Sequence, residues 1–450
     1  MPGLRVTVKG LAVVFKRLSL FCAIVAASSV LASPTWVENE NEVDFQVSAV
    51  NLRYLLDVVL ATHPIVDAGK AELRAANQGV KSARWQYYPT LGVSYQRAFA
   101  DDFDTNFQGD DDTTVFSLEQ PLWTGGRLRS GMASARADVE ISEASLEESR
   151  RELALRVVQA YGEWLAAWLQ NRTLAVSESR HQGLFERVDR RLAGGVSTGS
   201  DLELATGRLQ LVKADKAAAV AREISAIAVL AELTGERLSS DLLVASRQDL
   251  PQELVTAEQA LIDQALRYSP GIKRADAEVG LARAEIKARR AQAHPDVFLR
   301  FERQINDLQL AGQGSNSRVL VGVRSQLGAG LSSFSGVAQA RESIAAARAN
   351  RRSAELSIRE QIRADFALLK SFELRLPALE EAARTSTQVY ESYQRQFLTG
   401  RKSWLDVMNS ARDLQQARLQ LADVTAGRLT LAWRLFVLSN PMATSLRGRG

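Results

Sequence analysis

Hydrophobic and polar residues alternate in four short segments of this 450-residue chain. A period of two places successive side chains on opposite faces of a β-strand. Alternation of this kind also occurs in a soluble hairpin with one wet face. Each segment, however, is close to the length of about ten residues that crosses a bilayer when tilted. The predicted strands span residues 89–100, 113–122, 296–305 and 317–327.

Much longer segments carry apolar residues at heptad spacing. One series, between residues 131 and 193, consists of Leu146, Leu153, Ala160, Ala167 and Leu174. A second series consists of Ala205, Val212, Ala219, Ala226 and Leu233. Heptads sustained this long predict coiled-coil-like packing, and about 60 helical residues would extend roughly 90 Å. Residues 337–397 repeat the pattern, with a kink expected at Pro377.

The chain contains an internal repeat. His63-Pro64 and Ser269-Pro270 are separated by 206 positions, as are Tyr88-Pro89 and His294-Pro295. Pairs at an offset of 205 are Leu122 with Leu327, Gly125 with Gly330, Tyr161 with Phe366, Gly195 with Gly400, and Asp201 with Asp406. This constant register indicates two similar halves, 33–248 and 249–440, followed by a tail at 441–450. In each half we expect a helix, two strands, a very long helix, a turn and a long helix.

The number of strands constrains how they could enter a membrane. Four strands cannot close a membrane barrel, which needs at least about eight. Open edges cannot face lipid, because no water is present there to satisfy their backbone groups. If these strands span a membrane, several chains must share one barrel.

Residues 1–32 have the pattern of a secretory signal peptide. A basic region precedes an apolar core at residues 18–27, and Val30-Leu31-Ala32 offers a cleavage site. The alternative, a membrane anchor, needs roughly 20 apolar residues. The basic residues are Arg5, Lys9, Lys16 and Arg17. Cleavage of residues 1–32 would take the formal net charge from +4 to zero and would also remove Cys22, the only cysteine of the sequence. We therefore expect no disulfide, no thiol chemistry and no nucleic-acid partner.

The remaining residues do not indicate an enzyme. The three histidines, His63, His181 and His294, do not pair with carboxylates at metal-ligand spacing. The segment 101–112 holds six aspartates without a calcium-loop pattern, which favours a solvated loop over a cation site. We expect no catalytic residue, no metal and no cofactor.

These features together resemble the TolC family of outer-membrane efflux and secretion proteins. The resemblance lies in Tyr88-Pro89-Thr90-Leu91, in residues 118–127 and in residues 400–407, and it covers nearly the whole mature chain. It implies a mainly α-helical protein with membrane β-structure, which assembles as a homotrimer. Twelve strands would form one β-barrel in outer-membrane lipid, and a long α-helical barrel would continue it into the periplasm. A mixed belt, including residues 235–251, would surround this tube.

The resemblance also implies a gate at the periplasmic end of the tube. In the family, a basic residue after the second tip glycine bonds an acid after the first, and Lys402 and Asp201 occupy these positions. Asp406 matches one member of an acidic ring at the entrance, whereas Asn409 replaces another. The alternative for Asp201 and Asp406 is that each caps the helix that follows its turn.

The partners follow from the same resemblance. The tip residues Gly195, Val196, Gly400 and Arg401 would receive a periplasmic adaptor protein linked to an inner-membrane ABC or RND transporter. The channel would be a passive exit duct for type I protein secretion or multidrug efflux, and residues 400–406 are similar to adhesin-exporting members. The alternative is a periplasmic coiled-coil scaffold or adhesin that forms no pore. A hydrolase is disfavoured by the residues present.

Overall fold

The computed structural model describes residues 50–99, 109–243, 251, 257–309, 314–325 and 332–441. The chain divides into two units, Met1–Val47 and Ser48–Gly450. The first unit lies outside the described residues, and with it the predicted signal peptide. Most of the aspartate-rich loop, part of the predicted belt and residues 442–450 also lie outside them.

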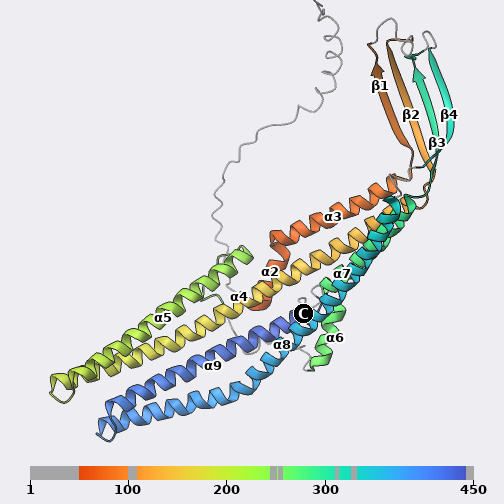
Figure 1. Ribbon diagram of the computed structural model, residues 1–450. Coiled ribbons are helices and arrows are strands. Elements are labelled where there is room, and N and C mark those ends of the chain that lie inside the picture. Colours follow the sequence, from red (N-terminus) through yellow and green to blue (C-terminus); the bar gives the residue numbers. More distant parts are fainter. Residues whose placement is uncertain are drawn as a thin grey trace, which may run out of the picture. The chain divides into compact units, whose positions relative to one another are not determined.

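The two halves of the second unit contain the same elements in the same order (Figure 1). The first half comprises α2 (Leu52–Thr62), α3 (Pro64–Trp85), β1 (Thr90–Arg97), β2 (Asp112–Trp123), α4 (Arg127–Ala193) and α5 (Gly199–Thr234). The second comprises α6 (Glu258–Tyr268), α7 (Pro270–Ala291), β3 (Asp296–Ile305), β4 (Ser315–Arg324), α8 (Ser332–Leu398) and α9 (Trp404–Ser439). Corresponding helices have identical lengths of 11, 22, 67 and 36 residues. The predicted duplication is confirmed.

A proline divides the first helical segment of each half into two helices, where the sequence suggested one. His63 and Ser269 precede these prolines and have extended backbone conformations, with ψ of 133° and 119°. A residue before proline avoids the helical region, whereas proline itself is tolerated at the first helical position. The side chains of His63 and Ser269 then cap α3 and α7 by accepting hydrogen bonds from amides in the first turn, at 3.2 and 3.3 Å.

The long helices pack along their predicted heptad seams. All ten heptad residues named above on α4 and α5 are buried, none more than 7% exposed. The helix α4 packs against α5 and α9, and α8 packs against α9 (Figure 1). At 1.5 Å per residue, a helix of 67 residues extends roughly 100 Å. The helix α8 continues through Pro377, so this proline does not end it.

The largest core forms where α2, α4, α5 and α9 meet. Its central aromatic residues, Tyr161, Trp164 and Trp433, are at most 1% exposed. Gly162 permits the close approach of α9, because a Cβ atom at this position would lie 2.0 Å from the Thr430 hydroxyl oxygen. A separate core holds α6 against α8 and α9.

Arg151 connects α4 to the ends of two other helices. Its side chain is buried, and Nη2 donates hydrogen bonds to the carbonyl oxygens of Tyr268 at 3.0 Å and Asn440 at 3.4 Å. These carbonyls lie at the C-terminal ends of α6 and α9, where helix carbonyls lack intrahelical donors and carry partial negative charge. Burial lowers the pKa of Arg151 to about 10, so the guanidinium stays charged at neutral pH.

Replacing Arg151 should therefore destabilise the junction of these helices. In Arg151→Met, two helix-end carbonyls lose a charged donor, which should lower the free energy of unfolding by about 1–3 kcal/mol. Thermal unfolding of the detergent-solubilised protein, followed by circular dichroism, measures the loss. Arg156→Met is the matched control, since Arg156 is exposed on the same helix and makes no hydrogen bond or ion pair among the described residues. Equal melting temperatures for the two variants would contradict this role.

Candidate functional site

The four strands form one antiparallel sheet in the order β1-β2-β3-β4 (Figure 1). Each strand ends within three residues of its predicted bounds. The register pairs Leu91 with Leu118, Leu118 with Phe301, and Phe301 with Val319. Paired residues share a face of the sheet, so these four side chains form one row across it.

One face of this sheet is apolar and exposed. Its side chains are each at least 37% exposed: Leu91, Val93, Tyr95, Phe116, Leu118, Leu299, Phe301, Val319, Val321 and Val323. Along β3 the opposite face is the more buried one, at Phe298, Arg300 and Glu302. A one-sided sheet in water buries its apolar face and exposes the polar one. The arrangement here is reversed, as in a sheet whose outer face contacts lipid.

The opposite face carries an ordered set of charged side chains. Glu119 accepts a hydrogen bond from Arg300 Nε at 3.0 Å and lies 3.5 Å from Arg324 Nη2. The guanidinium of Arg324 also stacks 4.7 Å from the centre of the Phe298 ring. Arg318 pairs with Glu302 at 3.1 Å. The four-stranded sheet thus has one apolar face and one charged face.

Exposed aromatic side chains collect where the strands meet the helices. Trp85, Tyr87, Tyr88 and Trp123 are 69%, 40%, 54% and 50% exposed. Trp and Tyr are enriched at membrane–water interfaces, because one part of the ring system is apolar and the other is polar. Their position at one end of the apolar strand surface is that of an interfacial girdle.

The helix hairpins end in two closely similar turns. Gly195 and Gly400 have positive φ angles of 71° and 73°, which glycine adopts without the strain of a Cβ atom. After each turn comes a capping box, made by Thr198 with Asp201 at the start of α5 and by Ser403 with Asp406 at the start of α9. Both predicted site acids therefore cap helices, as the alternative interpretation held.

Lys402 and Asp201 form separate contacts within the single chain. Asp201 Oδ2 accepts a hydrogen bond from the Thr198 amide at 3.0 Å. The Lys402 ammonium lies 4.0 Å from Asp406 Oδ2 and 4.4 Å from the Tyr393 ring centre. In the part of the chain that the structure describes, no ion pair joins Asp201 to Lys402. Their predicted pairing stays a prediction about assembled copies.

The charge at the second tip is set by local hydrogen bonds. The side chain and amide of Ser403 donate to Asp406 and, with Lys402 nearby, hold the pKa of that carboxyl below its ordinary value. Asp406 is therefore ionised at neutral pH. Asn409 is half-buried one turn further along α9, and Val196 and Arg401 are exposed at the tips.

Sequence analysis missed the apolar cluster that joins the two hairpins near their tips. Leu184 and Val188 of α4 pack with Tyr390 and Phe397 of α8 and with Trp404 of α9, all less than 9% exposed. Ala205 is the heptad residue named above that belongs to this cluster. A heptad pattern within one helix cannot indicate that residues about 200 positions apart meet in one cluster.

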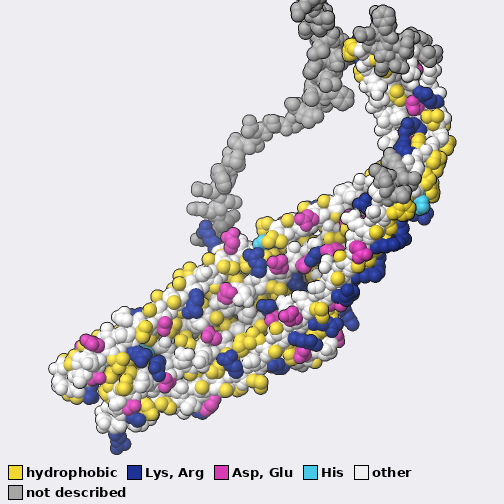
Figure 2. Space-filling view, in the orientation of Figure 1, with side chains coloured by type: hydrophobic (Ala, Val, Ile, Leu, Met, Phe, Trp, Pro, Cys, Tyr) yellow, Lys and Arg dark blue, Asp and Glu magenta, His cyan; other side chains and the backbone are white. Residues whose placement is uncertain are grey.

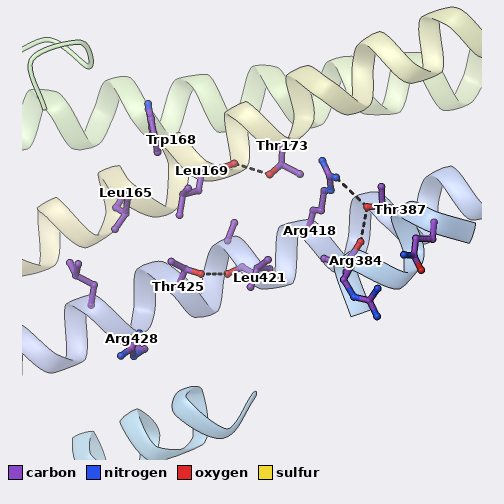
Figure 3. Close-up of a pocket in the computed structure, with 14 residues that line it drawn as sticks. Leu165, Trp168, Leu169, Thr173, Arg384, Thr387, Arg418, Leu421, Thr425 and Arg428 are labelled. Atoms are coloured by element: carbon purple, nitrogen blue, oxygen red, sulfur yellow. Dashed lines mark hydrogen bonds between the residues drawn. The ribbon is translucent and has the colours of Figure 1, made fainter. Parts of the chain in front are cut away.

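A cavity of about 740 Å³ lies between α4, α8 and α9 (Figure 3). Its α4 wall is apolar, with Leu165, Trp168 and Leu169, whereas Arg418 donates a hydrogen bond to Thr387 at its edge, at 3.2 Å. It contains no pairing of nucleophile and base. Among the described residues there is no cluster of His, Cys, Asp and Glu that could hold a metal ion. In the same residues, no helix is long and apolar enough to cross a membrane.

Residues 55–236 and 261–440, which correspond to the two halves, match the family model for outer membrane efflux proteins. The chain belongs to this family. Protein CyaE of Bordetella pertussis is 24% identical over 248 residues, which cover 54% of this chain and 52% of CyaE. The outer membrane efflux protein BepC of Brucella suis is 21% identical over 393 residues, covering 85% of this chain and 84% of BepC. The outer membrane protein VceC of Vibrio cholerae has the same fold, with a TM-score of 0.74 at 16% identity over 87% of this chain and 96% of VceC.

Membership of this family shows the general function of the chain. The chain is a subunit of an outer-membrane channel for efflux or secretion that extends into the periplasm. The predicted family, fold class and location are confirmed. The scaffold alternative leaves the reversed sheet unexplained, and the family consists of channel proteins rather than enzymes.

The two faces of the sheet should tolerate charge differently. Val93→Arg places a charge on the apolar face, where it costs about 2–4 kcal/mol near the middle of a bilayer. Ser94→Arg, the matched control, places the same charge on the opposite face, because the two neighbours pair with Phe116 and Val115. We expect the Val93 variant to be depleted from the outer-membrane fraction, measured by quantitative immunoblotting. Equal amounts of both variants would show that the apolar face does not contact lipid.

Proposed function

We propose that three copies of this chain form one passive exit duct across the outer membrane. The observation that carries this proposal is a sheet with an exposed apolar face and two edges, β1 and β4, each paired on one side only. Edges of this kind cannot enter lipid unless each finds a partner. Pairing β4 of one copy with β1 of the next satisfies both edges, and three copies supply twelve strands.

Exposed apolar side chains on the helices support association of the copies. The helix α5 exposes Leu211 and Ile224, at 59% and 63%, and α8 exposes Leu356 and Leu374, at 67% and 79%. Within the chain α5 packs mainly against α4, and α8 against α9 and α7. The remaining flanks of α5 and α8 are therefore available, and contact between α5 of one copy and α8 of the next would bury them.

We propose that the helix-hairpin tips control the opening of the duct and bind its partner proteins. Val196 and Arg401 are exposed beside the tip glycines Gly195 and Gly400. We assign these four residues to docking of a periplasmic adaptor, which would link the duct to an inner-membrane ABC or RND transporter. The cargo would be a protein in type I secretion or small molecules in multidrug efflux.

The same tips carry the proposed latch. Lys402 lies two residues after Gly400, and Asp201 lies six residues after Gly195. Pairing of the two between neighbouring hairpins would hold the tips together. Asp406 and Asn409 would line the entrance. Exposed ion pairs contribute only about 0–1 kcal/mol each, so a partner that binds the tips could open the latch without unfolding a helix.

The native mass of the protein extracted from outer membranes tests the proposed assembly. In mild detergent, light scattering should give three times the mass of the mature chain, because the strand edges are satisfied only in the closed assembly. Recovery of a monomer would overturn the shared duct.

Removing the latch charges should open the resting channel. The double variant Asp201→Asn with Lys402→Gln keeps a capping acceptor at the start of α5 but abolishes the charge pair. We expect a higher single-channel conductance in planar bilayers than for the unmodified protein. Asp215→Asn with Lys213→Gln is the matched control, since it removes the same two charges from exposed positions further along α5. If the conductance of both double variants equals that of the parent, the latch assignment is wrong.

A further inference from the structure

A second cavity, of about 510 Å³, lies where the sheet meets the helices. We call it the junction cavity. It is formed by the ends of α7 and β4, the start of β3, and the first turns of α4 and α8. Its charged and polar side chains are Arg127, Arg289, Gln292, His294, Asp296, Arg324, Ser332 and Ser333. This part of the molecule is rich in basic residues, and Figure 2 shows Lys and Arg side chains along α7 and the adjoining length of α8.

Positive charge predominates in the junction cavity. Arg127 Nη2 bonds Asp296 Oδ2 at 3.0 Å, so the one carboxylate among the described lining residues already has a partner. Arg324 lies 3.5 Å from Glu119, which is also bonded by Arg300. Arg289 is exposed and has no hydrogen bond or ion pair within the described residues. The starts of two helices of 67 residues also border the cavity, and helix N-termini favour anions.

The sheet register shows which side the cavity faces. Asp296 pairs directly with Arg324 across β3 and β4, so both lie on the charged face of the sheet together with Glu119 and Arg300. Arg289 of α7 lines the same cavity as Asp296 and Arg324. Arg290 is turned about 100° around α7 and does not line the cavity. In the proposed assembly the apolar face contacts lipid, so the charged face is directed to the interior.

The duplication does not repeat the basic residues that the second half contributes to this cavity. By the repeat offsets, the positions that correspond to Arg289, His294 and Arg324 are Ala83, Tyr88 and Glu119. Arg290, in contrast, corresponds to another arginine, Arg84. Arg289, His294 and Arg324 are therefore not needed to build the repeated scaffold.

We propose that the junction cavity is a binding site for an oxyanion, a phosphate or carboxylate group, supplied by anionic cargo in the interior of the duct. Arginine offers several donors in a planar fork that matches such groups. Among the described lining residues, Arg289 is the arginine whose donors are not already engaged. Three copies would place three sites at one level of the duct and attract anions by their summed field. The interior position rests on the proposed function, whereas the binding of the anion does not.

Calorimetric titration with inorganic phosphate tests the site itself. The full-length protein in a nonionic detergent at low ionic strength should bind phosphate saturably. Arg289→Gln should weaken this binding about tenfold or more, as expected for the loss of a charged hydrogen-bond donor. Arg290→Gln, one residue away on the same helix, should bind as the parent does. Absence of saturable binding to the parent, or an equal loss in both variants, overturns the site.

The reversal potential of the channel tests where the site lies. Under a potassium chloride gradient, Arg289→Gln should shift the permeability ratio toward cations roughly twofold, and Arg290→Gln should leave it unchanged. If phosphate binding depends on Arg289 but the reversal potential of the Arg289→Gln variant equals that of the parent, the site does not lie in the interior of the duct.

The phospholipid that co-purifies with the protein distinguishes cargo from lipid. If Arg289→Gln also lowers co-purified phospholipid, that result assigns the site to a lipid headgroup instead. Failure to form any channel refutes the proposed function, while the titration still decides whether the site exists.

Discussion

The strands β1 and β4 each leave one row of backbone N–H and C=O groups without a partner in the sheet. In water such an edge is tolerable, but in lipid every unpaired group costs several kcal/mol. The apolar face of the same strands is exposed, so the sheet belongs in lipid and its edges must be closed by other copies. The structure of the chain is therefore complete only in an assembly, and its helices have to hold the strands in positions from which neighbouring copies can pair.

The helices meet this requirement because their lengths repeat between the two halves, although several of their charged residues do not. Corresponding helices of the two halves have the same lengths, which gives the strands of both halves similar supports. Several charged residues that carry specific contacts occur in one half only. Arg151, which holds two helix ends, corresponds to Leu356, and Lys402 corresponds to Ser197. Because backbone geometry follows the heptads and caps, individual surface charges could diverge without disturbing it.

The tips combine a rigid turn with a weak electrostatic contact. Capping boxes fix Asp201 and Asp406 against the starts of their helices, and the cluster around Trp404 and Phe397 holds the hairpins together by apolar burial. Burial of large apolar side chains contributes much more than exposed ion pairs do. In the proposed latch, charges at the tips would change partners while the hairpins keep their shape.

The sequence by itself determined the local structure and the repeat. Strand alternation, heptads, the helix-starting prolines and the tip glycines each depend on residues close together in the chain, and the offset between the halves needs only counting. The tertiary structure decided which distant residues share a face or a cavity. It placed Leu184 and Trp404 in one apolar cluster, and it showed that Arg289 rather than Arg290 lines the junction cavity. These relations depend on strand register and on the rotational phase of packed helices, and a shift of a single residue in either changes which side chains meet.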